Sequence, residues 1–334
     1  MGNNFKEELD LFKEAFLAKI KKSESIAISG HVRPDGDCIG SCLALYNYIK
    51  KNYDSKQVEV YLDQIPDTFF YLKGAKCVKT ERDTVMQYDL FISLDCGGID
   101  RLGSSQEVLL HAKDSVNIDH HVSNMGFAKL NHIEPDASST CEVLCGIFDE
   151  DKIDCEIATA LYTGIVHDTG VFKHSNTSRR TMEMAGLLLE KGVNSAKIID
   201  ESFYQKTYVQ NLILGRCLLE STLILDGKII VSSVSREQME FYQAESYDLE
   251  GIIDQLRVTK GVEVAILIHE INTGKYKVSL RSNGDVNVSK IAVYFGGGGH
   301  IKAAGCMMHG KVHDVIHNLT VHIESQLKEL GVIQ

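Results

Sequence analysis

The stretch SIAISGHVRPDGD, residues 25–37, decides how the first half of this chain folds. Residues 25–29 form a short apolar run, which is typical of a buried β-strand. A loop follows that carries three potential metal ligands, His31, Asp35 and Asp37. Apolar residues then recur at helical spacing over residues 38–51. The stretch therefore predicts a strand, a loop and a helix, with the polar side chains at the carboxyl end of the strand.

The same alternation continues through the first half of the chain. We predict further strands over residues 58–62, 89–94 and 115–118, and helices from residue 138 and over residues 155–166. Strands that alternate with helices predict an α/β fold with a doubly wound parallel sheet. Such sheets keep their binding sites at the carboxyl ends of the strands.

The second half has a different pattern. Residues 181–222 are mostly helical in character, and residues 208–220 are predicted to form a connecting helix. The predicted strands are 228–234, 262–270 and 275–280, and the predicted helices are 250–258, 288–295 and 312–330. This pattern indicates a smaller α+β domain. We therefore predict a first domain over residues 1–190, a helical linker over 191–222 and a second domain over 223–334.

Composition limits the classes of function. The chain has 334 residues and a formal net charge of −11, which argues against binding to long duplex nucleic acid but leaves room for a small anion in a local cationic pocket. No apolar run is long enough for a membrane span, and no signal peptide is evident, so we predict a cytoplasmic protein. The nine cysteines have no disulfide spacing; Cys141 and Cys145 are predicted to be small buried hydrophobes.

Two further carboxylates end apolar runs. Asp95 follows residues 89–94 and precedes two glycines, where it could bridge two cations. Asp168 ends the apolar run of a predicted helix. Each has an ordinary alternative. Asp95 could satisfy its own turn, Asp168 could belong to a helix C-terminal turn, and Asp35 or Asp37 could cap the next helix.

The sequence Asp119-His120-His121 follows the last strand predicted in the first domain. Adjacent histidines after a buried strand point in different directions, so one can bind metal while the other faces substrate. Asp119 could fix the tautomer of one imidazole. The alternative is a pair of ordinary surface histidines.

Four glycines, Gly296 to Gly299, precede His300. We expect them to form no regular element and to expose backbone N–H groups of the kind that bind phosphate. A flexible linker is the alternative, which their position inside a small domain disfavours. Arg281 could grip a terminal phosphate, or could simply be a solvated residue at a strand end. The predicted substrate-binding residues are Arg281, Ser282, Gly297, Gly298, Gly299 and His300.

The order of these motifs resembles the DHH phosphoesterase superfamily, and residues 296–300 resemble its accessory domain. The two-domain length is similar to that of the bacterial nanoRNases, which hydrolyse very short oligoribonucleotides and remove the 3′-phosphate of 3′-phosphoadenosine-5′-phosphate (pAp). The resemblance implies a catalytic first domain and a substrate-binding second domain. It also implies hydrolysis by a two-metal mechanism.

The resemblance further implies two Mn²⁺ ions, with Mg²⁺ or Co²⁺ as substitutes. The implied ligands are His31, Asp35 and Asp95 for one ion, and Asp37, Asp95, His120 and Asp168 for the other. Asp95 would then be the bridge, His121 would face the phosphate, and Asp119 would orient His120. Independently of the resemblance, mixed carboxylate and imidazole ligands suit Mn²⁺ better than an all-oxygen Mg²⁺ site.

The predicted substrates are short single-stranded RNA oligonucleotides, pAp or dinucleotides, with no membrane partner and with a homodimer as one option. Three alternatives stay open at this point. The first is a dinucleotide phosphodiesterase that acts on pApA or c-di-AMP, and the second is an inorganic pyrophosphatase. The third is a nucleotide-sensing module without catalysis.

Overall fold

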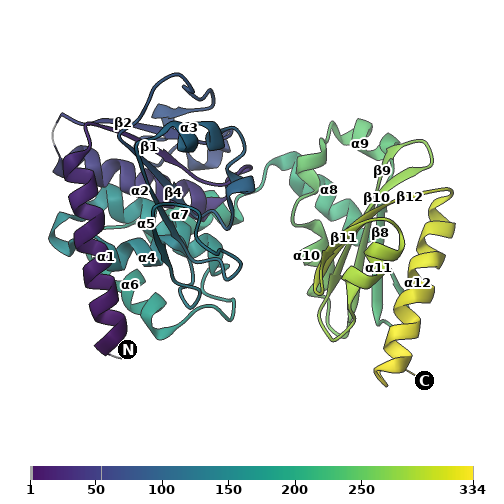
Figure 1. The fold of residues 1–334 in the computed structure, drawn as a ribbon. Coiled ribbons are helices and arrows are strands. Elements are labelled where there is room, and N and C mark those ends of the chain that lie inside the picture. The colour runs from purple at the N-terminus through teal and green to yellow at the C-terminus, as the bar shows by residue number, and fades with distance from the viewer. Residues whose placement is uncertain (1–2, 54, 334) are drawn as a thin grey trace. The chain divides into compact units, whose positions relative to one another are not determined.

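The structure is a computed structural model that describes residues 3–53 and 55–333. The chain divides into two units, one up to Gln205 and one from Lys206 onward. Each unit has its own six-stranded sheet (Figure 1).

The sheet of the first unit is entirely parallel. Its strands are β1 (Ser25–Ser29), β2 (Gln57–Tyr61), β3 (Val78–Lys79), β4 (Leu90–Leu94), β5 (Asp114–Asp119) and β6 (Leu130–Ile133). Their order is β3-β2-β1-β4-β5-β6, so the direction of winding reverses between β1 and β4. This order confirms the predicted doubly wound sheet. The edge strands β3 and β6 were not among the predicted strands, because both are too short to show a hydrophobic pattern of their own.

Helices cover both faces of this sheet. They are α1 (Asn3–Lys22), α2 (Gly36–Asn52), α3 (Ser105–His111), α4 (Thr140–Ile147), α5 (Cys155–Asp168), α6 (Arg179–Glu190) and α7 (Ser195–Ile199). Shorter helical turns are η1 (Asp67–Phe69), η2 (Ala75–Cys77), η3 (Ile99–Leu102), η4 (Glu150–Lys152) and the π-helix η5 (Asp200–Tyr204). Ile26 and Ile28 of β1 pack under α1, α2, α4 and α5, whereas Ala27 belongs to a smaller apolar cluster with α3. The alternation of side chains along the strands thus supplies two apolar faces.

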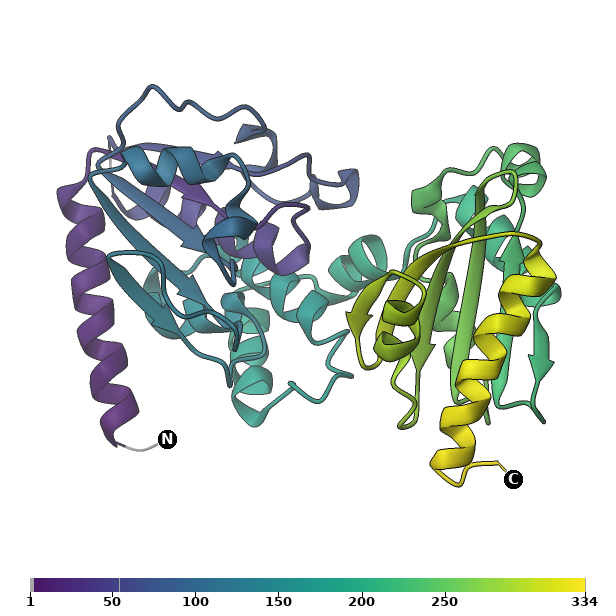
Figure 2. The same cartoon turned by 45° about the vertical axis from the view of Figure 1, so that its right-hand side comes forward.

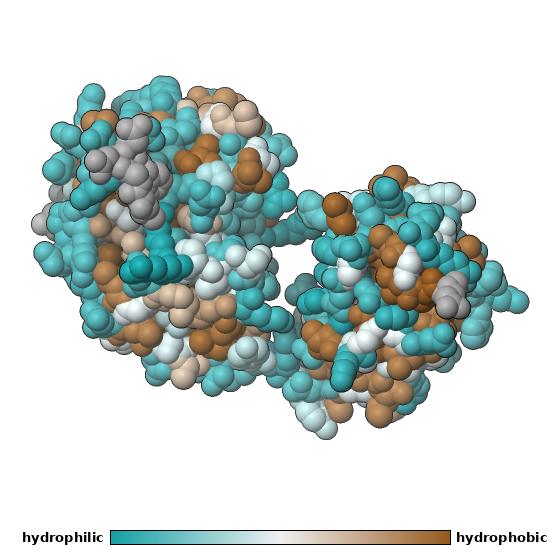
Figure 3. Space-filling view, turned by 90° about the horizontal axis from the view of Figure 1, so that it is seen from below, coloured by the Kyte–Doolittle hydropathy of each residue, from teal (hydrophilic) through white to brown (hydrophobic). Residues whose placement is uncertain are grey.

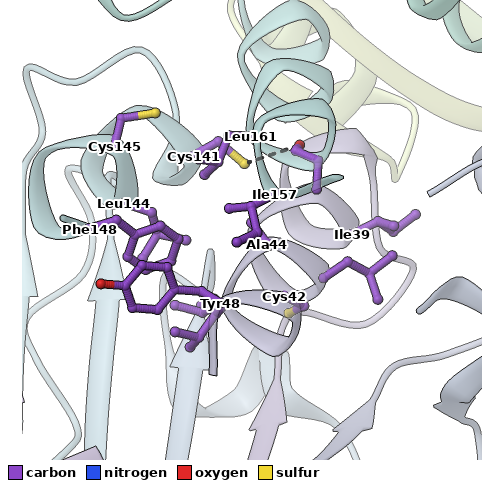
Figure 4. Packing of buried hydrophobic residues seen from close by; sticks show 14 of the residues in the cluster. Ile39, Cys42, Ala44, Tyr48, Cys141, Leu144, Cys145, Phe148, Ile157 and Leu161 are labelled. Atoms are coloured by element: carbon purple, nitrogen blue, oxygen red, sulfur yellow. Dashed lines mark hydrogen bonds between the residues drawn. The ribbon is translucent and has the colours of Figure 1, made fainter. Parts of the chain in front are cut away.

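The larger cluster is packed tightly around α2, α4 and α5 (Figure 4). Tyr48 of α2 stacks on Phe148 with their ring centroids 4.0 Å apart. Cys141 and Cys145 of α4 are both buried and both free thiols. The prediction that these two cysteines are small core residues is therefore confirmed.

The second unit has a mixed sheet. Its strands are β7 (Thr222–Ile224), β8 (Ile229–Val234), β9 (Val264–Asn272), β10 (Lys275–Ser282), β11 (Gly298–His300) and β12 (Ala303–His309). The order is β11-β12-β10-β9-β8-β7, in which only β8 and β9 are parallel neighbours. This mixed sheet confirms the predicted α+β architecture.

Both faces of the second sheet are also covered in part. The helices are α8 (Tyr208–Leu219), α9 (Arg236–Tyr242), the turn η6 (Ser246–Leu249), α10 (Ile252–Arg257), α11 (Val288–Tyr294) and α12 (Val312–Glu329). α11 and α12 pack on one face (Figure 2). α8, α9 and α10 pack on the other face, where Ile213 and Cys217 of α8 are buried.

The side of the molecule seen in Figure 3 is largely hydrophilic. Figure 3 shows polar residues over much of one side of each unit, with apolar residues in smaller groups between them. Among the described residues, no helix is both long enough and apolar enough to cross a bilayer.

Candidate metal centre and phosphate-binding face

The candidate metal ligands of the first unit gather where the sheet changes its direction of winding. β1 and β4 are neighbours (Figure 1). β5 lies beside β4 in the strand order. His31 follows β1, Asp95 follows β4 directly, and Asp119 ends β5. The crevice outside the carboxyl ends of strands at such a reversal is the usual ligand site of a doubly wound sheet.

Asp95 lies at the middle of this group. It is 1% exposed, and its backbone has a φ of 52°, a left-handed conformation that costs free energy in any residue except glycine. Its Oδ2 lies 3.6 Å from Nε2 of His31, and its Oδ1 lies 3.5 Å from Nε2 of His120. The two oxygens of one buried carboxylate thus face two different imidazoles.

Backbone carbonyls fix the direction of both imidazoles. Nδ1 of His31 lies 2.9 Å from the carbonyl oxygen of Val32, and Nδ1 of His120 lies 3.3 Å from that of Ala137. A carbonyl only accepts, so Nδ1 carries the proton in each ring and Nε2 faces the carboxylates. A metal ion that displaces the Nε2 proton would therefore meet a lone pair of each ring.

Asp168, the last residue of α5, completes the group on the side of His120. Its Oδ2 lies 3.2 Å from Nε2 of His120. Asp168 does end a helix, as the alternative of a helix C-terminal turn predicts, but its carboxylate also faces the imidazole that Asp95 faces. Its position is therefore compatible both with a helix end and with a metal ligand.

Asp35 also serves two roles. Its Oδ1 accepts hydrogen bonds from the backbone N–H groups of Asp37 and Cys38, both at 3.1 Å, and so caps α2. Its Oδ2 lies 3.5 Å from Nε2 of His31. One oxygen caps the helix and the other faces the candidate centre.

Asp37 is completely buried. Its carboxylate accepts the N–H groups of Thr140 at 2.6 Å and Cys141 at 3.0 Å, which are unpaired donors at the start of α4. Gly164 of α5 makes room for it, because a Cβ there would lie 2.5 Å from Oδ1 of Asp37. The first turn of α4 therefore fixes this carboxylate.

The pKa values reveal the charge balance of the centre. Burial and the nearby charges of Asp95 and Asp168 raise the pKa of Asp37 well above its usual range. Burial would lower the pKa of His31 and of His120, but hydrogen bonds to carboxylates outweigh it and raise each to about 12. The group of carboxylates thus draws in positive charge, which is what a cation site requires.

The donor atoms fit divalent cations. Ligands on one ion at about 2.1 Å lie about 3 to 3.5 Å from each other, and the contacts above are close to this range. Within the part of the chain that the structure describes, three groups have donor atoms within 4.8 Å of one another. They are His31, Cys38 and Asp95; Asp95, His120 and His121; and Asp37, His120 and Asp168. Asp95 and His120 each belong to two groups, so the same residues could hold two adjacent ions.

Asp119 differs from its prediction. Its Oδ1 accepts a hydrogen bond from Nδ1 of His121 at 2.8 Å. From His120 it accepts the backbone N–H, and it has no contact with the ring of that residue. The expectation that Asp119 orients the ring of His120 is therefore wrong. Residues two apart in an extended segment point to the same side, so Asp119 reaches His121 while the ring of His120 points away. Asn124 donates to the other oxygen, Oδ2, at 2.7 Å.

The glycine segment of the second unit also differs from its prediction. The N–H of Gly297 donates to the carbonyl of Ala292 at 2.8 Å, and Gly296 has a φ of 76°. This is a Schellman motif, in which glycine lets the chain leave helix α11. Gly298 and Gly299 then pair with β12 as part of strand β11. The expectation of no regular element is thus wrong, and the N–H of Gly297 is already bonded.

Strand pairing brings some of the predicted binding residues together. Ala303 of β12 pairs with Arg281 of β10 on one side and with His300 of β11 on the other. Arg281 and His300 therefore lie two strands apart on the same face, about 10 Å between backbones. Ser282 lies on the opposite face, where it is buried and its hydroxyl donates to the carbonyl of Gly284.

Arg281 also lines a cavity of about 340 Å³ between the sheet and α10. His269, Lys277 and Ser279 line it as well, and Asp254 supplies a carboxylate 3.7 Å from Nε of Arg281. The cavity wall thus carries the cations Arg281 and Lys277 together with the carboxylates of Glu250 and Asp254.

Sequence reasoning missed two residues that hold the first site together. Thr140 donates its hydroxyl to Oδ1 of Asp95 at 3.1 Å in addition to its backbone contact with Asp37. Asn124 joins Asp119 to the carbonyl of Cys96, which follows Asp95. Ser139 and Thr140 do carry the signal of a helix N-terminus, which could have located Thr140. No local signal marks Asn124.

Comparisons with known proteins agree with this architecture. Residues 25–165 match the model of the DHH family, N-terminal domain, and residues 226–329 match the DHHA1 domain. The chain belongs to the DHH family, in the form that carries a DHHA1 domain after the catalytic one. The resemblance seen in the motifs is therefore confirmed.

Individual relatives cover most of the chain. It is 30% identical over 290 residues to the bifunctional oligoribonuclease and PAP phosphatase NrnA of Thermus thermophilus, covering 85% of this chain and 84% of that protein. It is 28% identical to the protein of the same name from Mycoplasma pneumoniae, covering 90% and 92%. The crystal structure of an exopolyphosphatase-related protein from Bacteroides fragilis aligns with a TM-score of 0.85 at 26% identity, covering 96% and 97%.

Proposed function

We propose that this chain is a phosphoesterase that hydrolyses very short oligoribonucleotides to mononucleotides and removes the 3′-phosphate of pAp. Its family membership supports hydrolysis of phosphate esters, and the names of its relatives support these two substrates. One observation carries the proposal. Asp95 is buried at the reversal of the sheet and faces a separate imidazole with each oxygen.

In this proposal two Mn²⁺ ions are held by six side chains, with Asp95 shared between them. The ligands are His31, Asp35, Asp37, Asp95, His120 and Asp168. When bound, the ions would supply a water-derived nucleophile at neutral pH and would stabilise charge on the attacking and leaving oxygens. Imidazole nitrogen beside carboxylate oxygen favours Mn²⁺ over Mg²⁺.

His121 faces the substrate in this proposal. Its hydrogen bond to Asp119 raises its pKa, which favours the protonated form of the ring. With Nδ1–H donated to Asp119, the Nε2–H group is free to donate to a phosphate oxygen. Asp119 and Asn124 thus act as positioning residues, since they hold the ring of His121 without touching the phosphate.

The second unit would recognise a phosphate or the terminal nucleotide. Arg281 and His300 lie on one face of its sheet, and the cavity beside Arg281 is lined by Lys277 and His269. The cations Arg281 and Lys277 explain how a chain with a net charge of −11 can bind a nucleotide, since attraction is needed only locally. Because such substrates arise from RNA turnover within the cell, we infer a cytoplasmic site of action.

A substrate panel tests the proposal. The protein is incubated with Mn²⁺ and a di- to pentaribonucleotide, pAp, pApA, c-di-AMP or pyrophosphate, and the products are identified by mass. We expect mononucleotides from the short RNA, and AMP with phosphate from pAp. Turnover of c-di-AMP alone or of pyrophosphate alone would instead support the corresponding alternative. Nucleotide binding without any turnover would support a sensing module.

A further inference from the structure

Arg101 lies beside the candidate metal centre and has no role in the function proposed so far. It belongs to η3, six residues beyond Asp95. Its carbonyl accepts the N–H of Val32 at 2.8 Å, which ties η3 to the loop that carries His31. Gly103 permits this close packing, because a Cβ there would lie 2.5 Å from Cγ1 of Val32. The backbone of Arg101 is therefore fixed relative to His31.

The guanidinium group of Arg101 extends to the ring of His31. Its Nη2 lies 3.5 Å from Nδ1 of that ring. This is no hydrogen bond, because Nδ1–H of His31 is already donated to the carbonyl of Val32. The contact places the guanidinium at the edge of the centre while leaving its five N–H donors available.

Nothing else in the described residues neutralises this guanidinium. Arg101 is exposed, and within residues 3–53 and 55–333 no carboxylate forms an ion pair with it. By contrast, Arg82 pairs with Asp63, and Arg179 with Glu183. An unpaired arginine held beside a cluster of carboxylates and imidazoles is suited to bind an anion that arrives there.

The charge balance of the centre gives a reason for such a residue. Five carboxylates lie within it: Asp35, Asp37, Asp95, Asp119 and Asp168. Two divalent cations would bring four positive charges against these five negative ones, so the occupied centre would still repel a phosphate. The guanidinium of Arg101 supplies a cation from the side of His31.

We propose that Arg101 is a substrate-binding residue that donates to a non-bridging oxygen of the phosphate at the metal centre. This inference rests on the proposed function, and it deepens that function by assigning the recognition of a phosphate monoester or diester to the first unit itself. His121 and Arg101 would then grip the phosphate from the two sides of Asp95, since one imidazole contact of Asp95 is with His121 and another with His31.

Binding of AMP and of inorganic phosphate tests this without any turnover. Both probes are titrated by calorimetry into the Mn²⁺-loaded full-length protein and into Arg101→Ala, Arg101→Lys and Arg179→Ala. Arg179 is the matched control, because it is an exposed arginine whose partner is Glu183. We expect Arg101→Ala to weaken binding of both probes by about 10- to 100-fold, as loss of a charge-assisted hydrogen bond should. Arg101→Lys should lose less, and Arg179→Ala nothing.

The affinity for Mn²⁺ shows whether Arg101 binds the phosphate directly or only holds the metal ligands in place. We expect Arg101→Ala to keep the wild-type affinity for Mn²⁺, measured by electron paramagnetic resonance of the free ion. The proposal would be overturned if Arg101→Ala bound AMP as tightly as the wild type. It would also be overturned if Arg101→Ala lost affinity for Mn²⁺ and bound AMP normally once Mn²⁺ was saturating. If the wild-type protein binds AMP through Arg101 but hydrolyses no member of the substrate panel, the proposed function fails while this inference stands.

Discussion

The two units build their candidate sites from six-stranded sheets in opposite ways. The parallel sheet of the first unit places polar side chains beyond the ends of its strands, where Asp37 and Asp95 are buried and held by other groups. The mixed sheet of the second unit places Arg281 and His300 on a face, where each is reached from solvent. The first arrangement fixes geometry before a ligand arrives, as metal chemistry requires. The second supplies charge with less constraint, which suits recognition.

The largest effect is expected from Asp95, the centre of the fixed site. Asp95→Ala removes the carboxylate that faces both His31 and His120. We expect hydrolysis of pAp and short RNA with Mn²⁺ to fall by more than about 1,000-fold, since a shared ligand affects both ions. Circular dichroism should show a folded protein. Asp151→Ala, a substitution of an exposed aspartate, is the control. Retained turnover in Asp95→Ala would refute the proposed centre.

A smaller effect is expected from Thr140, which tests whether the fixed geometry matters. Thr140→Val keeps the size of the side chain and the backbone contact to Asp37 but removes the hydroxyl that donates to Asp95. Partners behind metal ligands typically contribute 10- to 100-fold in affinity, so we expect about a 10-fold weaker Mn²⁺ affinity. Turnover should recover at high Mn²⁺.

Two variants make the Thr140 experiment specific. Thr140→Ser restores a hydroxyl and should restore the affinity for Mn²⁺. Thr159→Val removes a hydroxyl that donates only to the carbonyl of Cys155 on the exposed side of α5, so it should leave that affinity unchanged. Equal effects of Thr140→Val and Thr159→Val would indicate a general loss of stability, and the special role of Thr140 would be lost.

The face of the second unit should respond differently. Arg281→Ala removes a cation that we propose binds the substrate away from the reacting atoms. We therefore expect KM for pAp and for a dinucleotide to rise about 10-fold, with kcat within about twofold. Arg281→Lys should be intermediate, because lysine keeps the charge but loses the planar fork. Arg216→Ala, on α8 and paired with Glu220, is the control. An unchanged KM for both substrates would remove Arg281 from the site.

The same contrast explains what the sequence could predict. The strand ends of the first unit were predictable, because a buried parallel strand is a continuous apolar run and the polar residue after it marks its carboxyl end. His31, Asp95 and His120 were located in this way. The edge strands β3, β7 and β11 were not, because two or three residues carry no period and form a strand only through pairing with a neighbour.

Errors in the site have equally local causes. The glycine segment was assigned to phosphate binding because four glycines without side chains were expected to leave their N–H groups exposed. In the structure, one of these groups, the N–H of Gly297, forms the hydrogen bond that ends α11. The partner of Asp119 was misjudged because the direction of a side chain two residues away depends on the backbone after β5. Thr140 contacts Asp95, which is far away in the sequence, and Asn124 reaches Asp119 through a turn. Such contacts depend on how the helices and strands pack.

The smallest expected effect concerns a half-buried carboxylate in the first unit that needs no metal. Glu59 of β2 is held by Lys79 and by the hydroxyl groups of Tyr61 and Tyr88. Burial opposes its charge, but these partners outweigh burial and lower its pKa from 4.5 to about 2. A lowered pKa in the folded state means that the charged form stabilises the fold. This stability is complete above pH 4.5 and is lost as the pH falls toward 2.

Glu59→Gln should therefore reduce the free energy of unfolding at pH 7 by about 2 kcal/mol, which is less than the full pKa shift would give because the neutral amide still forms hydrogen bonds. Urea unfolding followed by circular dichroism at pH 7, 5 and 3.5 should show the difference from wild type shrinking at the lowest pH. Glu24→Gln, at a side chain that is 79% exposed, should show little difference throughout. If the Glu59→Gln difference were constant with pH, packing rather than charge would hold Glu59.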